Sequence, residues 1–294
     1  MTALDDGDPA STAAGTDPLA ARVEALLAPL GGRTAAAARA LGHPPGIAGA
    51  AAMSDERELA LRASEELAAA SLAKVPIAVE LARRVDLGAF SLDERIDLAG
   101  IALVGGGGVL DALAASDEPG APNAFWLPTL GDLAALMLGV SDNTAANVLL
   151  DQVGMGEVNE TMARLGFGRT RLARRFMDFA ARAAGRENVT TAGDMAALMA
   201  LLARGAVPLA SRVRGWLVAD PLNDAVTLGL PPDAGVANKP GTLPGIINSA
   251  GILSGPGGEC AYCVLTAEQD DMPAAATAVA RVVRALWDAW CAPL

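Results

Sequence analysis

The sequence is short of histidine and of basic charge, and each shortage excludes a class of function. His43 is the only histidine and stands beside Pro44 and Pro45, so we expect no Ser-His-Asp triad. The 22 Lys and Arg residues face 34 Asp and Glu residues, which gives a net charge of −12. Such a charge repels the phosphates of nucleic acids and anionic lipids alike. We therefore expect neither a nucleic acid nor a membrane as a partner.

Cysteine is also scarce. Cys260, Cys263 and Cys291 allow one disulfide bond at most, which is too few for a disulfide-stabilised scaffold. Cys260 and Cys263 form a C-x-x-C pair, but no second pair and no nearby histidine accompanies them. Alternation along a strand would point the two side chains to opposite faces, which favours buried apolar residues over a redox or metal site. We expect no metal and no cofactor.

Signals for nucleotide binding, membrane insertion and export are missing too. The glycine run 105–108 is not followed by the Lys-Ser/Thr of a phosphate loop, which favours a turn or flexible loop. No apolar run reaches the roughly 18 residues of a membrane span. The N-terminus has acids where a signal peptide has bases, and no long apolar stretch follows. The chain as given, starting at Met1, therefore predicts a cytoplasmic protein, although a mature chain with its leader removed would look similar.

Core-forming residues, in contrast, are plentiful. Hydrophobic residues make up 52% of the chain and charged residues 19%, which is enough for one large domain or two medium ones. Apolar spacing predicts helices over residues 19–30, 75–84, 130–138, 144–153, 158–165, 195–204, 213–219 and 274–290. Short runs between turn residues predict strands over residues 58–62, 235–242, 250–253 and 260–266, with residues 34–41 and 47–53 strands or buried helical turns. Thr191 and Asp194 resemble a capping box at the start of one helix.

Strands near both ends around a helical middle predict an α+β fold. We expect one antiparallel sheet built from both ends of the chain and flanked by terminal helices, with an all-α domain inserted between its halves. Residues 1–16 are expected to be a disordered acidic tail. The sheet domain would comprise residues 17–69 and 206–294, and the all-α domain residues 70–205. The cleft between the two domains is the expected site.

A serine and a lysine three residues apart offer a nucleophile without histidine. Ser71 and Lys74 open a run of helical spacing, so the two side chains would share one helix face. A lysine in an apolar pocket loses its proton more readily, and its neutral amine can then accept the serine proton. Taken alone, the pair also fits a helix-capping serine followed by a solvated lysine.

Two further motifs follow in a recognisable order. Ser141-Asp142-Asn143 opens a predicted helix, and Lys239-Pro240-Gly241-Thr242 lies on a predicted strand near the C-terminus. With Ser71-Leu72-Ala73-Lys74, their order and spacing resemble the serine β-lactamase and penicillin-binding protein superfamily, and class A β-lactamases most of all. The resemblance extends over nearly the whole folded chain. It implies the β-lactamase-like fold, with the active site in the cleft between the sheet and the helical domain.

The resemblance implies roles for these residues. Ser71 would be the acylated nucleophile and Lys74 its proton acceptor, with Ser141 as a second proton shuttle. Lys239 would raise the positive potential around the two serines. Substrate-binding positions would be Asn143, Gly241 and Thr242, and the backbone N–H groups of Ser71 and Thr242 would form the oxyanion hole. Asp142 would be structural and turned away from the chemistry.

The sequence departs from the class A pattern at the residue that activates the deacylating water. Class A enzymes carry a glutamate there, in the loop between the second and third motifs. Alignment of that loop with residues 170–178 puts Phe176 in the glutamate's place. A phenyl ring cannot take a proton, and Asp178 is the only nearby acid that could act as a surrogate base.

Recognition of a substrate carboxylate is also altered. Pro240 stands where a hydroxyl residue normally precedes the glycine of the third motif, while Thr242 keeps another hydroxyl. Many relatives aim an arginine at the carboxylate, but Ala225 and Ile247 occupy its two usual places.

The sequence thus predicts a serine acyl-enzyme hydrolase that acts on a small-molecule amide, lactam or ester, with weak β-lactamase activity. One alternative is a cytoplasmic acyltransferase, esterase or amidase with a non-lactam substrate. Another is a slow-turnover, penicillin-binding-type protein, and a third is a degenerate binding protein that acylates once or not at all. The sequence leaves the oligomeric state open.

Overall fold

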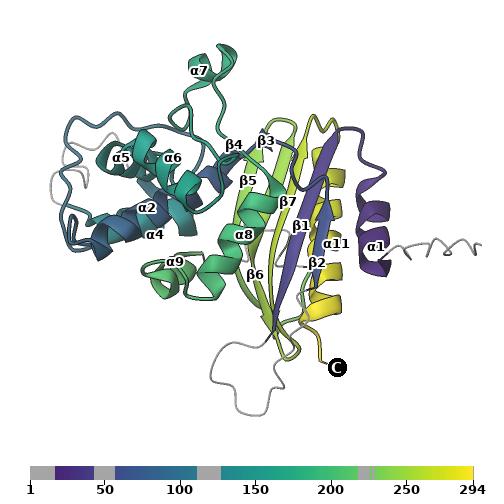
Figure 1. The fold of residues 1–294 in the computed structure, drawn as a ribbon. Helices are drawn as coiled ribbons and strands as arrows, with labels where there is room; N and C mark the ends of the chain where they lie inside the picture. Colours follow the sequence, from purple (N-terminus) through teal and green to yellow (C-terminus); the bar gives the residue numbers. More distant parts are fainter. Residues whose placement is uncertain (1–16, 43–56, 111–126, 218–225, 227–228, 294) are drawn as a thin grey trace, which may run out of the picture.

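The computed structural model describes residues 17–42, 57–110, 127–217, 226 and 229–293. The tail expected over residues 1–16, the segment expected at 47–53, His43 and Ala225 lie outside the described residues. The described chain consists of a sheet with helices on both faces and a group of helices beside it (Figure 1).

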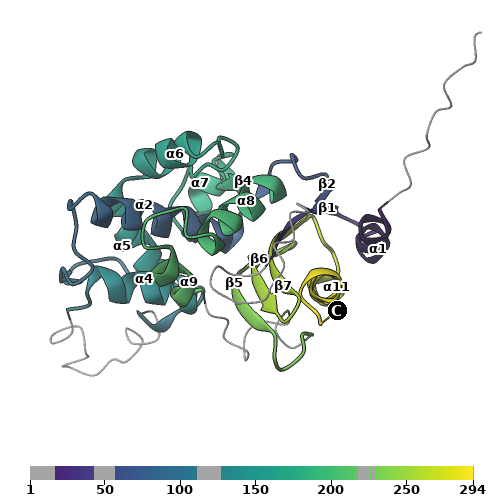
Figure 2. The same ribbon diagram turned by 60° about the horizontal axis from the view of Figure 1, so that its bottom comes forward.

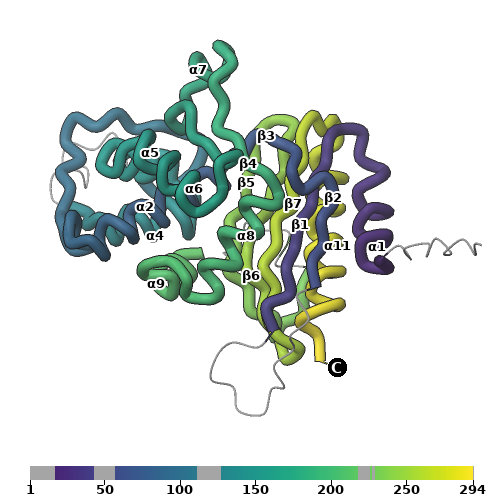
Figure 3. Tube along the Cα trace, viewed as in Figure 1, coloured from purple at the N-terminus to yellow at the C-terminus, as the bar shows by residue number. Residues whose placement is uncertain are grey.

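The sheet has five antiparallel strands in the order β2-β1-β7-β6-β5. They are β1 (Arg33–Gly42), β2 (Glu58–Leu61), β5 (Gly235–Leu243), β6 (Ile246–Gly255) and β7 (Gly258–Ala267). Arg33 of β1 lies opposite Ala267 of β7, so a strand from the beginning of the chain pairs with one near its end (Figure 3). This arrangement confirms the predicted α+β fold, with one sheet built from both ends of the chain.

Helices cover both faces of the sheet. Helices α1 (Pro18–Leu27) and α11 (Met272–Trp290) lie on one face, and α8 (Ala192–Ala203) packs on the other (Figure 2). The apolar stripe of α11, which includes Val279, Val283 and Leu286, is buried against the sheet. Burial of a continuous apolar stripe is the main force that holds such a helix in place.

The remaining elements form the helical region and a small second sheet. They are β3 (Leu67–Ala68), the 3₁₀ helix η1 (Ala70–Ala73), α2 (Lys74–Asp86), α4 (Leu130–Gly139), α5 (Asn143–Val153), α6 (Met155–Arg164), α7 (Phe179–Ala183), β4 (Val189–Thr190) and α9 (Ala210–Trp216). Helix α2 lies at the centre of this region, and its first nine residues are all buried. Two of these nine residues, Lys74 and Glu80, carry ionisable side chains, so the centre of the helical region contains polar groups that need partners.

Element boundaries differ from the sequence prediction for local reasons. Helix α1 ends at Leu27 rather than at residue 30, because Pro29 has no backbone N–H with which to continue the helical hydrogen bonds. Thr191 caps α8 as predicted, but the Asp194 carboxylate accepts a hydrogen bond from the Thr170 hydroxyl. A complete capping box lies instead at the start of α4. Strands β3 and β4 were not predicted, since two residues carry no pattern.

No helix in the described part of the chain is both long and apolar enough to cross a membrane.

Candidate active site

Ser71 and Lys74 meet at the junction between η1 and α2. Ser71 is the second residue of η1 and Lys74 is the first residue of α2, and the Lys74 Nζ lies 3.2 Å from the Ser71 Oγ. The preceding Ala70 has a φ of +49°, a left-handed conformation that costs an alanine energy. The residue that caps α2 is Ala73 and not Ser71, and Lys74 is fully buried. The alternative interpretation, in which Ser71 caps the helix and Lys74 is solvated, is therefore wrong.

Four neutral oxygens surround the amine of Lys74. Its Nζ lies 2.6 Å from the backbone oxygen of Ser141, 2.7 Å from the Asn143 Oδ1, 3.0 Å from the Ser141 Oγ and 3.2 Å from the Ser71 Oγ. Burial lowers the pKa of Lys74 well below its usual value and the charge of Lys239 lowers it further, while Asp142 opposes the shift. A neutral amine here can accept a proton from a neighbouring hydroxyl.

The Ser141-Asp142-Asn143 segment turns two polar side chains toward Lys74 and one away. Ser141 has a φ of +59°, and its Oγ donates to the Ser71 Oγ at 3.0 Å. Asn143 donates from its Nδ2 to the Gly105 backbone oxygen at 3.0 Å. The carboxylate of Asp142 accepts from the backbone N–H groups of Ala145 and Leu110, each at 2.8 Å, so it caps α5 and anchors a neighbouring loop.

Strand β5 passes directly beside the nucleophile. A Cβ atom on Gly241 would lie 3.3 Å from the Ser71 backbone nitrogen, a tighter contact than most Cβ atoms make. Glycine therefore lets the strand bring its backbone, including that of Thr242, close to Ser71. Lys239 is buried on the same strand, and its Nζ donates to the Pro240 backbone oxygen at 3.3 Å.

Asn248 of β6 holds the segment before Ser71 and was missed by the sequence analysis. Its Nδ2 donates to the Ala68 backbone oxygen at 2.9 Å, while its Oδ1 accepts from the Thr266 backbone N–H at 2.9 Å. The side chain thus links the sheet to the nucleophile segment. An asparagine on a strand carries no sequence signal for this contact.

Phe176 lies against Lys74. Its ring centroid is 4.9 Å from the Lys74 Nζ, and its side chain is buried. The Asn147 side chain fixes the Phe176 backbone, since Oδ1 accepts from its N–H at 2.9 Å and Nδ2 donates to its oxygen at 3.1 Å. Asn147 lies one turn after Asn143 on α5, and this spacing is the one signal by which the sequence could have revealed it.

The loop that carries Phe176 is closed at its base. Arg171 and Val189 form an isolated β-bridge, and the guanidinium of the buried Arg174 lies 2.7 Å from the Glu187 carboxylate. Asp178 lies in the same loop, where its Oδ1 accepts from the Ala181 backbone N–H at 2.8 Å and caps α7. Asp178 is not among the residues that line the cavity beside Ser71.

That cavity has a volume of about 320 Å³. It is lined by Ala70, Ser71, Gly106, Asn143, Arg174, Phe176, Met177, Phe179, Asn188, Thr242, Leu243, Pro244 and Met272. Part of its wall comes from the glycine run, which forms a loop as predicted. Gly108 has a φ of +117°, and a Cβ atom there would lie 2.4 Å from the Asp142 carboxylate. Only glycine fits this approach.

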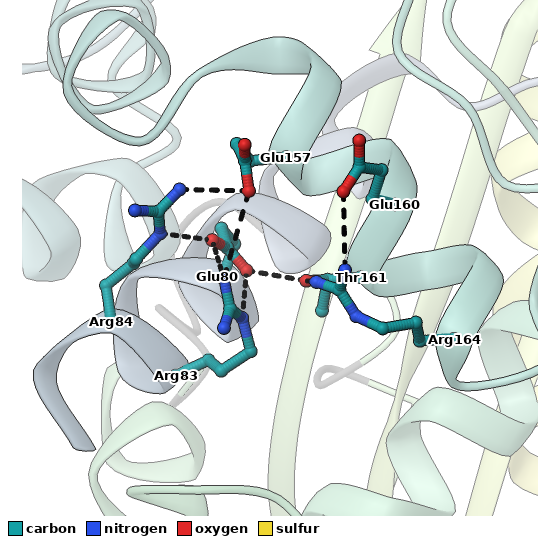
Figure 4. A network of polar contacts seen from close by, with 7 residues as sticks. All are labelled: Glu80, Arg83, Arg84, Glu157, Glu160, Thr161 and Arg164. Atoms are coloured by element: carbon teal, nitrogen blue, oxygen red, sulfur yellow. Dashed lines mark hydrogen bonds and ion pairs between the residues drawn. The ribbon is translucent and has the colours of Figure 1, made fainter. Parts of the chain in front are cut away.

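A second polar cluster fixes the helix that begins with Lys74 (Figure 4). The carboxylate of Glu80 has no exposed surface and accepts from Arg83 at 2.7 Å, from Arg84 at 2.8 Å and from the Thr161 hydroxyl of α6 at 2.6 Å. Burial alone would raise the pKa of Glu80, but these hydrogen bonds outweigh burial and lower it. The cluster ties α2 to α6, and no sequence motif indicated it.

The cysteines do not form a site. All three are buried and free, and burial raises the pKa of the Cys260 and Cys263 thiols well above its usual value. Cys260 packs in the core under α11 and Cys263 in the core under α8, so they lie on opposite faces of β7 as strand alternation predicts. No group of three or more potential metal ligands occurs among the residues that the structure describes.

Comparison with known proteins identifies the family. The model of the β-lactamase enzyme family matches residues 19–290. The chain belongs to the β-lactamase enzyme family.

Solved structures of this family share the fold. The β-lactamase from Sphaerobacter thermophilus DSM 20745 is 27% identical with a TM-score of 0.74, and the match covers 92% of this chain and 96% of that one. An ancestral (GNCA) class A β-lactamase is 28% identical with a TM-score of 0.75, over 92% of this chain and 99% of that one. The last common ancestor of Gram-negative bacteria (GNCA4) class A β-lactamase is 26% identical with a TM-score of 0.75, over 93% and 99%. A search of the curated proteins finds no match.

The family and its class A neighbours make this β-lactamase-family protein a serine hydrolase of β-lactamase type with a β-lactamase-like fold.

Proposed function

We propose that this β-lactamase-family protein hydrolyses an amide, lactam or ester bond of a small molecule through an acyl-enzyme on Ser71. The observation that carries the proposal is the 3.2 Å contact between the Ser71 Oγ and the Nζ of the fully buried Lys74. Burial favours the neutral amine, which takes the hydroxyl proton as the oxygen attacks the substrate carbonyl. Lys74 is thus the general base of acylation.

Ser141 and Lys239 complete the proton path and the local potential. The Ser141 Oγ lies 3.0 Å from both the Ser71 Oγ and the Lys74 Nζ, a position from which it can carry the proton on to the leaving nitrogen or oxygen. Lys239 raises the positive potential around both serines. Its charge already acts on Lys74, whose pKa it lowers.

The backbone N–H groups of Ser71 and Thr242 are the proposed oxyanion hole. The close approach of Gly241 to the Ser71 nitrogen supports this assignment, because it puts the strand backbone beside the carbonyl that Ser71 attacks. Asn143 positions Lys74 through its Oδ1, and with Gly241 and Thr242 it is the proposed contact for the substrate.

Deacylation differs from the class A pattern, because the phenyl ring of Phe176 lies where a base would be needed. The ring packs on Lys74 and supplies neither a proton acceptor nor a polar contact for water. Asp178 caps α7 instead. We therefore assign the second half-reaction to Lys74 and Ser141, with slow turnover on lactams.

Intact-mass measurement after mixing with a penicillin and a panel of activated esters tests the proposal. We expect a covalent adduct of one equivalent in the parent protein and none in Ser71→Ala, since the variant loses the nucleophile and little stability. Labelling of Ser71→Ala at the parent rate would disprove the role of Ser71.

The same measurement separates the alternatives. An acyltransferase would lose its adduct faster when an alcohol or amine acceptor is added, whereas a hydrolase would not depend on the acceptor. A penicillin-binding-type protein would keep the adduct and turn over slowly with every substrate, and a degenerate binding protein would show no turnover at all.

A further inference from the structure

The cavity beside Ser71 is walled mostly by apolar side chains. They come from the loop, the start of α7, the end of β5 and the start of α11: Phe176, Met177, Phe179, Leu243, Pro244 and Met272. Phe176 is buried, Met177, Leu243 and Met272 are half-buried, and Pro244 and Phe179 are exposed. An aromatic and aliphatic wall of this kind favours an apolar ligand group, because burial of apolar surface is favourable.

Three polar side chains of the wall, those of Arg174, Asn188 and Asn143, are engaged with the protein itself. The guanidinium of Arg174 pairs with Glu187 and also donates to the Arg175 backbone oxygen at 3.1 Å. The Asn188 Oδ1 accepts from the Arg174 backbone N–H at 3.0 Å. The Asn143 Oδ1 accepts from Lys74. These bonds fix the loop around the cavity and give the cavity no charge aimed at a ligand.

Strand β5 and its neighbour β6 have no polar side chain at two positions beside the nucleophile. Pro240 has neither a side-chain hydroxyl nor a backbone N–H, and Ile247 lies directly across from Thr242 in the sheet register. The net charge of −12 adds a long-range repulsion against anions. Lys239 is buried on this strand, and its Nζ donates to the Pro240 backbone oxygen.

We propose that the cavity takes the apolar, uncharged acyl chain of a carboxylic ester. The inference rests on the proposed role of Ser71. A volume of about 320 Å³ is at the small end for ligand cavities, which fits a short acyl chain of roughly four to eight carbons. With the chain in the cavity, the ester carbonyl meets Ser71 and the alcohol faces away from the loop.

The reaction on such an ester balances without a cofactor. The Ser71 Oγ forms a bond to the carbonyl carbon, the bond from that carbon to the alcohol oxygen breaks, and the serine proton passes through Lys74 and Ser141 to the leaving alcohol. Water then cleaves the ester on Ser71, returns the proton to Ser71 and releases the carboxylic acid.

A series of p-nitrophenyl esters tests the substrate class: acetate, butyrate, hexanoate and the negatively charged hemisuccinate. Burial of each methylene should raise kcat/KM by about three- to fourfold. Because hexanoate has four more methylenes than acetate, we expect it to exceed acetate by about 80-fold or more. We expect butyrate to exceed hemisuccinate, which is of similar length, by at least about tenfold. Equal rates along the series, or a preference for hemisuccinate, would overturn the inference while Ser71-dependent labelling kept the proposed function intact.

A pair of charge variants locates the chain in the cavity. Phe179→Asp puts a carboxylate at the cavity wall on the first residue of α7, where a helix start tolerates an acid. Leu209→Asp adds the same charge at the start of α9, outside the cavity lining. The hexanoate-to-acetate ratio should fall about tenfold in Phe179→Asp and stay unchanged in Leu209→Asp. Partial unfolding would lower both esters alike, so the ratio stays informative. An unchanged ratio in Phe179→Asp would show that the chain binds elsewhere.

Discussion

Helix α2 buries two ionisable side chains six residues apart and treats them in opposite ways. Glu80 keeps its charge, because two arginines and a threonine hydroxyl surround its carboxylate and lower its pKa. The amine of Lys74 lies among four neutral oxygens and a phenyl ring, and burial lowers its pKa well below the usual value. Burial with counter-ions thus makes a structural anchor, whereas burial without an adjacent counter-ion makes a base.

The difference depends on what the protein places next to each group. Glu80 contacts Arg83 and Arg84 of its own helix and Thr161 of α6, so its partners are fixed by local spacing and one helix packing. Lys74 meets residues from α5 and from the loop that carries Phe176. Its state therefore depends on the whole assembly of the helical region.

Removal of the Lys74 amine should have the largest effect. We expect Lys74→Ala to slow acylation by an activated ester about 100-fold or more, as the loss of a positioned general base does. Lys74→Arg keeps a positive charge but cannot give up its proton, so it should be slow as well. Stopped-flow acylation rates measure both. Fast acylation by Lys74→Arg would mean that the charge, and not the base, assists Ser71.

A carboxylate placed beside Lys74 should give this lysine the adjacent counter-ion that Glu80 has and that Lys74 lacks. We expect Phe176→Glu to speed release of a lactam adduct about tenfold or more, since a carboxylate there can activate water. The same carboxylate should raise the pKa of Lys74, because an opposite charge favours the ammonium, and so shift the rise of the acylation rate to higher pH. Decay of the adduct in intact-mass spectra and a pH–rate profile of acylation measure the two effects.

Asp178 provides the matched control. If Phe176→Glu still traps the adduct while Asp178→Asn slows turnover of the parent, then Asp178 holds the water and the alignment of the loop is wrong. Asp178→Asn should instead leave turnover nearly unchanged, because the carboxylate caps α7 and an asparagine can cap a helix equally well.

Loss of charge at Glu80 should act on stability rather than on chemistry. We expect Glu80→Gln to lower the free energy of unfolding by about 2 kcal/mol, because hydrogen bonds to a charged group are replaced by weaker neutral ones and two arginines lose their partner. Acylation by the folded variant should stay close to the parent rate. Denaturant unfolding and stopped-flow acylation at low denaturant distinguish the two. A large loss of acylation without a loss of stability would show that the cluster acts on the active site.

Sequence reasoning reached the fold because the fold depends on patterns that repeat over many residues. Local periodicity predicts the apolar stripe of α11 and the strands near both ends of the chain. The prediction holds even when the ends of an element are misplaced by a few residues. The three motifs likewise predicted a group of residues that the structure brings together: Ser71, Lys74 and Ser141 lie within 3.2 Å of one another through their side-chain atoms. Their roles stay predictions until the variants are measured.

The supporting contacts could not be predicted, because they join residues far apart in sequence through single side chains. Asn248 reaches the backbone of Ala68, and Asn147 fixes Phe176 in its place beside Lys74. Such contacts depend on how helices and strands pack, and nothing in the sequence distinguishes the asparagines that make them from the others. The Glu80 cluster was missed for the same reason, since a carboxylate near two arginines on a helix usually indicates a solvated face.

The contribution of Glu80 to the pH dependence of the unfolding free energy should be the smallest effect, and the direction of its change with pH follows from the lowered pKa. The folded pKa of Glu80 lies below its ordinary value, so its contribution to stability is fully present above that ordinary value and is lost as the pH falls through the folded pKa. The difference in unfolding free energy between the parent and Glu80→Gln should therefore be constant near neutral pH and shrink in acid. Urea unfolding at a series of pH values from neutral to below 4 measures this difference. A gap that stayed constant into strong acid would mean that the Glu80 charge contributes nothing and that the shape of the side chain alone ties α2 to α6.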